Sequence, residues 1–130
     1  MMEEVNVFTD GGSRGNPGPA GIGIYITGKK GKEIVSIGKR IGLATNNVAE
    51  YTAVIEALRW LRNNPIIQLS NNPIIQFYLD SNLVVQQLNG NFKVKEPHLR
   101  ELLLVVRELE QEVRGAVHYN AIPREQNRRA

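Results

Sequence analysis

The fold of this chain is organised around one stretch near its N-terminus, Val5-Asn6-Val7-Phe8-Thr9-Asp10-Gly11-Gly12-Ser13-Arg14-Gly15-Asn16-Pro17-Gly18-Pro19. β-Branched residues alternate with other side chains in its first half, which predicts a strand. We expect the strand to end at Asp10, because glycines and prolines follow it. A carboxylate after an apolar strand, next to a glycine-rich opening that a substrate backbone could approach closely, suits a metal or phosphate site. The plainer alternative is an aspartate in a tight turn.

Composition limits the class of protein. The chain has 130 residues, of which 42% are hydrophobic, which suits one compact domain with a real core. It has no cysteine, so disulfide frameworks and cysteine zinc sites are excluded. Its net charge of +3 and its pI near 9.4 are compatible with a nucleic-acid partner. No apolar run approaches the roughly 20 residues of a membrane span, and the acidic N-terminus lacks a signal-peptide pattern. We therefore expect a cytoplasmic protein with no membrane partner.

Turn signals and hydrophobic periodicity divide the rest of the chain into strands and helices. A hairpin turn is predicted at 28–31, and Asn47 is predicted to cap the first helix, with Glu50 as its capping-box partner. The predicted order is strands at 20–27 and 32–41, a helix at 47–62, a strand leading to Asp80, helices at 82–88 and 97–113, a strand at 116–122 and the start of a helix at 124–130. The predicted fold class is α/β, with a five-stranded mixed sheet (a three-stranded antiparallel meander plus two parallel strands) and helices on both faces.

A short duplication interrupts this pattern. Asn63-Asn64-Pro65-Ile66-Ile67-Gln68 recurs as Asn71-Asn72-Pro73-Ile74-Ile75-Gln76. Two copies of six residues do not make a repeat protein. We expect the first copy to lengthen a surface loop and the second copy to lead into the fourth strand.

Three carboxylates are predicted to meet at one edge of the sheet. Asp10 and Asp80 each follow a strand, and neighbouring strands would place them about 5 Å apart at the backbone. Glu50, one turn into the crossover helix, could reach the same corner. Clustered carboxylates repel one another unless cations neutralise them, and such oxygen ligands suit Mg²⁺ or Mn²⁺. Two ions about 4 Å apart would serve phosphodiester hydrolysis. Taken singly, the three residues could instead be a turn residue, a capping-box partner and a helix N-cap.

Four motifs in the same order resemble type 1 ribonuclease H (ribonuclease HI). They are Thr9-Asp10-Gly11-Gly12-Ser13-Arg14-Gly15-Asn16-Pro17-Gly18-Pro19-Ala20-Gly21, Thr45-Asn46-Asn47-Val48-Ala49-Glu50-Tyr51, Asp80-Ser81 and Ile122-Pro123-Arg124-Glu125-Gln126-Asn127. The resemblance covers nearly the whole chain. It implies the ribonuclease H-like fold and endonucleolytic cleavage of the RNA strand of RNA–DNA hybrids with two Mg²⁺ or Mn²⁺ ions.

The resemblance also implies roles for individual residues. Asp10, Glu50 and Asp80 match the metal-binding catalytic carboxylates. Amide side chains at the matching positions would hydrogen-bond 2′-hydroxyls and base edges. The positions that would contact the hybrid are Gly12, Asn16, Thr45, Asn46, Asn47, Asn82 and Arg124.

The chain departs from the family pattern in three ways. It lacks the basic, Trp-bearing helical protrusion that many relatives carry between the short helix and the long helix. Only residues 91–96 fill this position, as in the protrusion-lacking bacterial and archaeal-like subset. No His follows His118, so Arg124 would replace the histidine that aids turnover. The family's final carboxylate would follow Ala130. We therefore expect a single ribonuclease H domain over 1–130 that lacks the end of its C-terminal helix and cleaves slowly, because the second ion would lack a ligand. Glu125 is a conceivable replacement, but it lies more than a turn of helix upstream of that position and points in a different direction.

Two other functions compete with the nuclease hypothesis. A catalytically impaired hybrid-binding module would use the same groove with an incomplete metal site. A Rossmann-type nucleotide-binding domain fails, because neither G-x-G-x-x-G before a helix nor G-x-x-x-x-G-K-[ST] occurs. We expect a monomer with no obligate protein partner.

Overall fold

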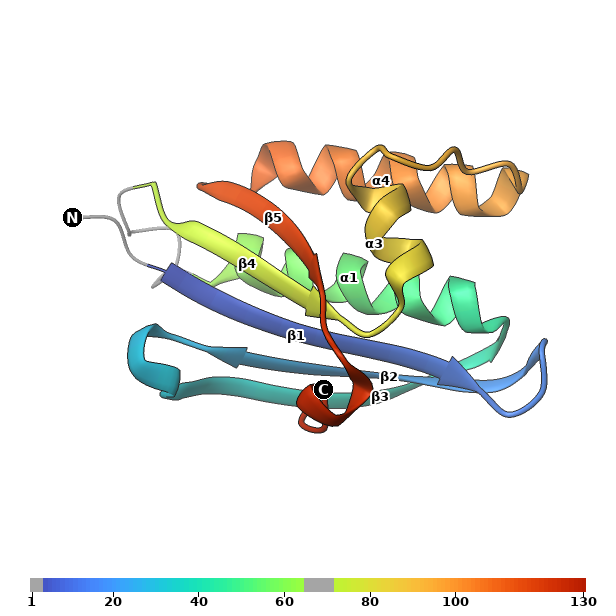
Figure 1. Ribbon diagram of the computed structural model, residues 1–130, viewed down its shortest axis with the longest axis horizontal. Helices are drawn as coiled ribbons and strands as arrows, with labels where there is room; N and C mark the ends of the chain where they lie inside the picture. The colour runs from blue at the N-terminus through green and yellow to red at the C-terminus, as the bar shows by residue number, and fades with distance from the viewer. Residues whose placement is uncertain (1–3, 65–71) are drawn as a thin grey trace.

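The computed structural model describes residues 4–64 and 72–130, and it contains one five-stranded sheet of order β3-β2-β1-β4-β5 (Figure 1). The first three strands form an antiparallel meander, and the last two run parallel to β1. The bounds are β1 Glu4–Ser13, β2 Gly18–Thr27, β3 Glu33–Ala44, β4 Ile74–Leu79 and β5 Ala116–Ala121. The predicted α/β class and mixed sheet are confirmed.

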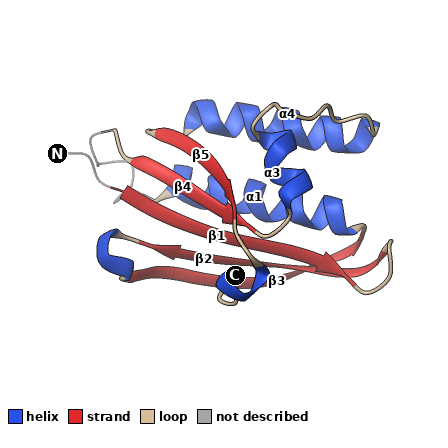
Figure 2. Ribbon diagram, viewed as in Figure 1, coloured by secondary structure: helices blue, strands red, loops and turns tan. Residues whose placement is uncertain are grey.

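Three described α-helices lie on one face of the sheet (Figure 2). They are α1 (Asn46–Asn63), α3 (Asn82–Leu88) and α4 (Pro97–Glu112). The side chains of Val5, Val7 and Thr9 are buried on this face, because alternate residues of a strand point to the same side. Phe8 and Asp10 lie on the opposite face, where Phe8 stacks on Tyr78 at 5.0 Å. The apolar core therefore lies between the sheet and α1.

The prediction of helices on both faces is wrong for the α-helices of the described residues, because the opposite face carries only a short C-terminal segment with the 3-10 turn η2 (Figure 2). Residues Arg124–Gln126 form only the 3-10 turn η2, and Asn127 leaves helical geometry. The prediction that an α-helix starts at 124–130 is therefore wrong within this segment. The guanidinium of Arg129 lies 5.6 Å from the Tyr25 ring centroid, and a Cβ on Gly23 would meet Ala130 at 2.2 Å. The segment thus packs directly on a bare part of the sheet.

The N-cap of the first helix lies two residues earlier than predicted. Thr45, not Asn47, is its N-cap, and the Thr45 hydroxyl accepts a hydrogen bond of 3.2 Å from the Val48 N–H. A threonine oxygen in the extended region satisfies an otherwise unpaired amide of the first turn. Glu50 is therefore not a capping-box residue. Its carboxylate is available for the sheet edge instead.

Strand β1 does not end at Asp10, contrary to the prediction. It pairs with β4 only as far as Phe8↔Tyr78, whereas its pairing with β2 continues to Ser13↔Ala20. β1 and β4 therefore diverge after Phe8, and Asp10 lies where the two strands separate. This fork leaves room for side chains from both strands.

Two remaining predictions concern chain segments away from this fork. The 28–31 turn is confirmed as the 3-10 turn η1 (Lys29–Gly31) between β2 and β3. The second copy of the duplication leads into β4 as predicted, whereas residues 65–68 of the first copy lie outside the described residues. None of the described helices is both long and apolar enough to cross a membrane. The expected cytoplasmic location stays a prediction.

Candidate active site

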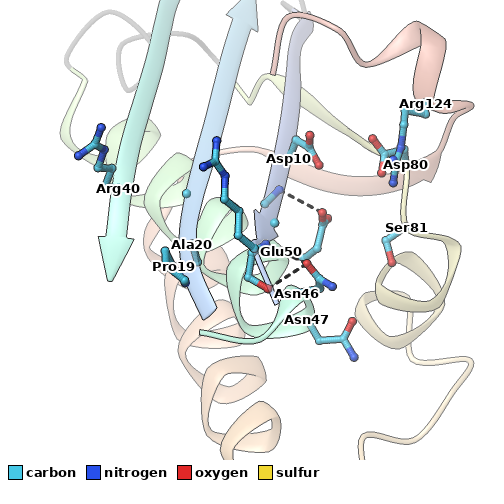
Figure 3. A pocket seen from close by; sticks show the side chains of 15 residues that line it. Asp10, Pro19, Ala20, Arg40, Asn46, Asn47, Glu50, Asp80, Ser81 and Arg124 are labelled. Atoms are coloured by element: carbon cyan, nitrogen blue, oxygen red, sulfur yellow. Dashed lines mark hydrogen bonds between the residues drawn. The ribbon is translucent and has the colours of Figure 1, made fainter. Parts of the chain in front are cut away.

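Asp10, Glu50 and Asp80 come together at the fork between β1 and β4. Each offers a carboxylate oxygen, and these atoms all lie within 4.8 Å of one another. Asp10 comes from β1, Asp80 follows β4, and Glu50 projects from the first turn and a half of α1 (Figure 3). Among the described residues this group, here called the carboxylate corner, does not include Glu125, which is exposed on η2. The predicted convergence is confirmed.

Burial disfavours the ionised form of the carboxyl groups in the carboxylate corner. Glu50 is only 6% exposed, and burial raises the pKa of its carboxyl to about 8 from an ordinary 4.5. Burial also raises the pKa of Asp10, and the nearby charge of Asp80 raises it further. Removing a carboxylate from water penalises its charged form, and a neighbouring anion adds to that penalty. The corner thus favours a proton or a cation.

One oxygen of Glu50 is held and the other is not. Its Oε1 accepts a 3.0 Å hydrogen bond from the Gly11 N–H. Its Oε2 is buried and accepts no hydrogen bond within 4–64 and 72–130, and only a proton shared with the neighbouring carboxylate of Asp10 would give Glu50 a second hydrogen bond. A buried oxygen without a partner is costly unless a ligand satisfies it. The set of oxygen donors therefore fits a hard divalent cation.

Gly11 brings α1 close enough to make this bond. A Cβ at this position would lie 2.3 Å from the carbonyl carbon and oxygen of Ala49 and 2.7 Å from the Glu50 nitrogen. Only glycine allows the strand and the helix backbone to approach so closely. We predicted that these glycines allow a substrate backbone to approach closely. That prediction is wrong for Gly11, which instead allows the backbone of α1 to approach.

Asn127 supports the corner from the C-terminal segment. Its Nδ2 donates to the Thr9 carbonyl at 2.9 Å and to Asp80 Oδ2 at 3.2 Å, and the residue is only 4% exposed. It thereby ties η2 to both β1 and the loop after β4. Asn127 was not predicted as a site residue, although it lies within a motif of the family resemblance.

A second group of polar residues, here called the amide cluster, joins the loop after β1 to the start of α1. Asn46 Oδ1 accepts from the Ser13 N–H at 2.9 Å and from the Ser13 hydroxyl at 3.2 Å. Asn16 Oδ1 in turn accepts from the Asn46 N–H at 2.9 Å. The hydrogen bonds among Ser13, Asn16 and Asn46 therefore fix the loop against the helix.

An open groove of about 1020 Å³ joins the carboxylate corner to the amide cluster. Gly12 of β1 pairs with Gly21 of β2, and Gly21 pairs with Arg40 of β3. Because glycine has no side chain, no side chain lies between β1 and Arg40 in this row of the sheet. Of the predicted substrate contacts, Gly12, Asn46, Asn47 and Arg124 line the groove, and Figure 3 shows the last three. Thr45, Asn16 and Asn82 are not among the residues that line it. Their side-chain oxygens accept hydrogen bonds from the Val48 N–H, the Asn46 N–H and Gln86 Nε2, respectively.

Two arginines of the groove, Arg14 and Arg40, were not predicted as site residues. Among the described residues neither takes part in an ion pair of the kind that Arg62 and Arg107 make with glutamates. The cross-strand row Gly12-Gly21-Arg40 could have identified Arg40, but only with the correct register of the meander. The groove thus has carboxylates and arginines along its walls.

The fold and this site define an α/β protein with a cluster of carboxylates, of the kind that binds metal ions, at the fork between two parallel strands of a mixed sheet. The chain belongs to the RNase H family, whose model matches residues 2–120. This confirms the resemblance stated from the motifs.

Solved structures of relatives agree over nearly the whole chain. The chain is similar to LC11-RNase H1 from compost, in a crystal structure with an RNA/DNA hybrid, with a TM-score of 0.90 and 41% identity over 97% of this chain and 90% of that one. It is also similar to RNase H1 of the archaeon Halobacterium salinarum, with a TM-score of 0.87 and 36% identity over 98% of this chain and 91% of that one.

Some curated relatives are much longer. The bifunctional protein Rv2228c of Mycobacterium tuberculosis is 38% identical over 95% of this chain, which spans 32% of that protein. Ribonuclease HI of Halobacterium salinarum is 39% identical over 81% of this chain and 50% of its own length. The chain therefore corresponds to one part of these relatives.

Proposed function

We propose that this protein hydrolyses the RNA strand of RNA–DNA hybrids with the help of divalent metal ions. The observation that carries the proposal is the carboxylate corner, where three carboxylate oxygens lie within 4.8 Å and a buried Glu50 oxygen has no partner in the described part of the chain. Membership of the RNase H family supports the same activity. The structure of LC11-RNase H1 with an RNA/DNA hybrid supports the choice of substrate.

Asp10, Glu50 and Asp80 would hold the metal, with Mg²⁺ or Mn²⁺ as the ions that their hard oxygens prefer. Bound divalent ions would activate water and stabilise the charge that develops on the phosphate. The protein orients these ligands: the Gly11 N–H fixes Glu50, and Asn127 fixes Asp80. Arg124, exposed on the wall of the groove beside Asp80, would contact a phosphate of the substrate.

The uncharged part of the groove suits a strand that carries 2′-hydroxyls. Asn47 lines the groove (Figure 3), and its side chain makes no hydrogen bond among the described residues. An amide can donate to and accept from a 2′-hydroxyl or a base edge, which distinguishes RNA from DNA. We therefore expect Asn47→Ala to raise KM for the hybrid.

The test is a cleavage assay on labelled RNA–DNA hybrid, single-stranded RNA and duplex DNA of the same sequence, with Mg²⁺ and with a chelator. The proposal predicts cleavage of the hybrid alone, only with metal, and binding that weakens steeply with salt. Equal cleavage of single-stranded RNA would overturn the assigned substrate, and hybrid binding without cleavage in Mg²⁺ or Mn²⁺ would indicate a binding module instead.

A further inference from the structure

The outer edge of β5 carries main-chain groups that point away from the sheet. The Ala116 N–H donates to the carbonyl of Pro73, just before β4, at 3.0 Å. Because main-chain groups of successive residues point to opposite edges of a strand, the even-numbered residues of β5 face β4, whereas Val117 and Tyr119 face outward. Figure 1 shows β5 as the last strand of the sheet. No further strand of the described chain therefore pairs with these two residues.

A side-chain amide already occupies one of these outward groups. Asn89 Nδ2, at the end of α3, donates to the Tyr119 carbonyl at 3.2 Å. This bond agrees with the outward direction of Tyr119, and its donor is an amide N–H, as in a bond from another strand. Within the described residues, the Val117 N–H, the Val117 carbonyl and the Tyr119 N–H have no hydrogen-bond partner. The edge thus offers both donors and acceptors.

An open groove of about 500 Å³, here called the β5 groove, lies beside this edge. Val117 and Tyr119 line it from β5, Leu88 from α3, and Arg107 and Glu110 from α4. Hydrogen bonds fix the α4 wall, because Glu110 accepts from Arg107 Nη1 at 3.0 Å and from the Tyr119 hydroxyl. A guanidinium has five N–H donors, and the Arg107 side chain is 40% exposed. Arg107 therefore retains donors for a ligand in the groove.

The two free edges of the sheet differ in how they are protected. β3 pairs with β2 through two register shifts and carries exposed Lys39 and Arg40. Bulges and charges of this kind keep other strands from pairing with an edge. β5 pairs with β4 without a shift, and between Ala116 and Ala121 it has no proline and no Asp, Glu, Lys or Arg. Its edge is therefore open to another strand.

We propose that the outer edge of β5 binds an extended segment of a partner protein, which adds to the sheet as a further strand. Free donors and acceptors along a strand edge are matched by another polypeptide main chain, which would pair with Val117 and with the Tyr119 N–H. A side chain that accepts hydrogen bonds, such as threonine, contacts Arg107 on the α4 wall. Strand addition gains affinity from main-chain bonds and specificity from alternate side chains. The inference goes beyond the proposed function, since the β5 groove shares no lining residue with the groove of the candidate active site.

The probe is the synthetic peptide acetyl-Thr-Val-Thr-Val-Thr-amide, titrated into the isotope-labelled protein while amide resonances and hydrogen exchange are followed by NMR. Without peptide, the amides of Val117 and Tyr119 should exchange faster than those of His118 and Asn120, which face β4. The peptide, at concentrations up to about 10 mM, should shift the resonances of Val117 and Tyr119 and slow their exchange.

Two modified peptides serve as matched controls on the wild-type protein. One carries N-methyl groups on every threonine and the other on every valine, so each loses the N–H groups along one of its two edges. An added strand presents only alternate N–H groups to its neighbour. One modified peptide should therefore lose binding, and the other should keep it.

Three protein variants test the same contact. Val117→Pro removes an outward N–H and should weaken peptide binding about fivefold or more, and the variant should fold because proline is tolerated on edge strands. Ala121→Pro is the matched control, because this residue also faces outward but does not line the β5 groove, and it should bind the peptide like the wild type. Asn89→Ala frees the Tyr119 carbonyl and should tighten binding a few-fold, a gain that unfolding cannot produce. Thermal unfolding and hybrid cleavage, measured for each proline variant, should stay near the wild-type values.

Several results would overturn the proposal. They are the absence of any change at about 10 mM peptide, equal binding of the two N-methylated peptides, and equal weakening by Val117→Pro and Ala121→Pro. Slower exchange of the Val117 amide on raising the protein concentration alone would show pairing between copies of this chain, and slower exchange on adding hybrid would show a nucleic-acid contact. Either of these would overturn the assignment to a partner protein.

Discussion

The carboxylate corner and the amide cluster lie on the same groove but differ in how their polar groups are satisfied. In the amide cluster, Asn46 and Asn16 accept hydrogen bonds from neighbouring backbone and hydroxyl groups. In the carboxylate corner, one oxygen of Glu50 is buried without a partner among the described residues. The protein's own donors satisfy the amide oxygens of the first group, whereas the buried Glu50 oxygen of the second group has no donor in the described part of the chain.

The two groups therefore have different roles: the amide cluster positions the backbone of the site, and the carboxylate corner provides the ligands for a cation. The amide cluster holds the loop after β1 at the start of α1, and its members are exposed or half-buried, so each residue gives only modest stability. The carboxylate corner works against stability, because a buried anion close to two others is disfavoured until a cation binds. Changes in the corner should therefore affect activity strongly, and changes in the cluster should affect activity and stability mildly.

The largest expected effect is on catalysis. Asp80→Asn or Asp10→Asn should reduce cleavage of the hybrid on the order of 1000-fold, because each removes a charged metal ligand. Neither variant should unfold the protein, and each should melt at the same or a slightly higher temperature because repulsion within the corner is relieved. Single-turnover cleavage and thermal unfolding measure the two effects. Near-wild-type cleavage by either variant would show that the corner is not the metal site.

The next effect concerns the contact that holds Glu50. Gly11→Ala should lower the free energy of unfolding by about 2 kcal/mol or more, since its Cβ would collide with the backbone of Ala49. It should also reduce cleavage, because Glu50 loses the orientation given by the Gly11 N–H. Denaturant unfolding and hybrid cleavage test this. Gly38→Ala is the matched control, because a Cβ there meets nothing within 4 Å, and that variant should be neutral or slightly more stable.

The smallest effect concerns the amide cluster. Asn46→Ala should cost about 1 kcal/mol of stability, because the Ser13 N–H loses its acceptor, and should raise KM a few-fold. Asn46→Asp keeps an acceptor for Ser13 but adds a negative charge beside a polyanionic substrate. It should therefore preserve stability while raising KM further. If both substitutions lowered stability equally and left KM unchanged, the cluster would have no part in binding substrate.

Much of this fold and site was predictable because strand alternation and glycine or proline breaks dominate the sequence. The strands follow from alternating residues such as Val5 and Val7, and the meeting of Asp10 and Asp80 follows from placing two strands side by side. The β1 end was predicted wrongly because Gly11 and Gly12 usually stop a strand, whereas here β2 continues to pair with them. Tertiary pairing overrode the local preference.

Other features depended on contacts that local patterns do not encode. Thr45 and Asn47 are both good capping residues, and only the contacts of the folded helix select Thr45. Asn127 reaches Thr9 across 118 positions of sequence, so no periodicity reveals it. Arg40 reaches the groove only through the register of β2 and β3. The motifs thus identified the three carboxylates of the corner, whereas the contacts that hold them in place became visible only in the folded structure.

The most direct test of this account measures stability against pH without divalent metal. Burial raises the pKa of Glu50 to about 8 in the folded protein, whereas its ordinary value is 4.5. Stability from the protonated form is therefore complete below about pH 4.5 and is lost as the pH rises toward 8, with a slope of at most about 1.4 kcal/mol per pH unit from this residue. The raised pKa of Asp10 acts in the same direction.

The measurement is chemical unfolding of the wild type and of Glu50→Gln from pH 4.5 to 8.5, with a chelator and then with Mg²⁺. The wild type should lose stability as the pH rises and regain it when Mg²⁺ binds the ionised carboxylates, whereas Glu50→Gln should show a shallower pH slope and a smaller response to Mg²⁺. Identical pH slopes and identical Mg²⁺ responses in the two proteins would contradict the claim that Glu50 is a buried carboxylate whose charge requires a cation.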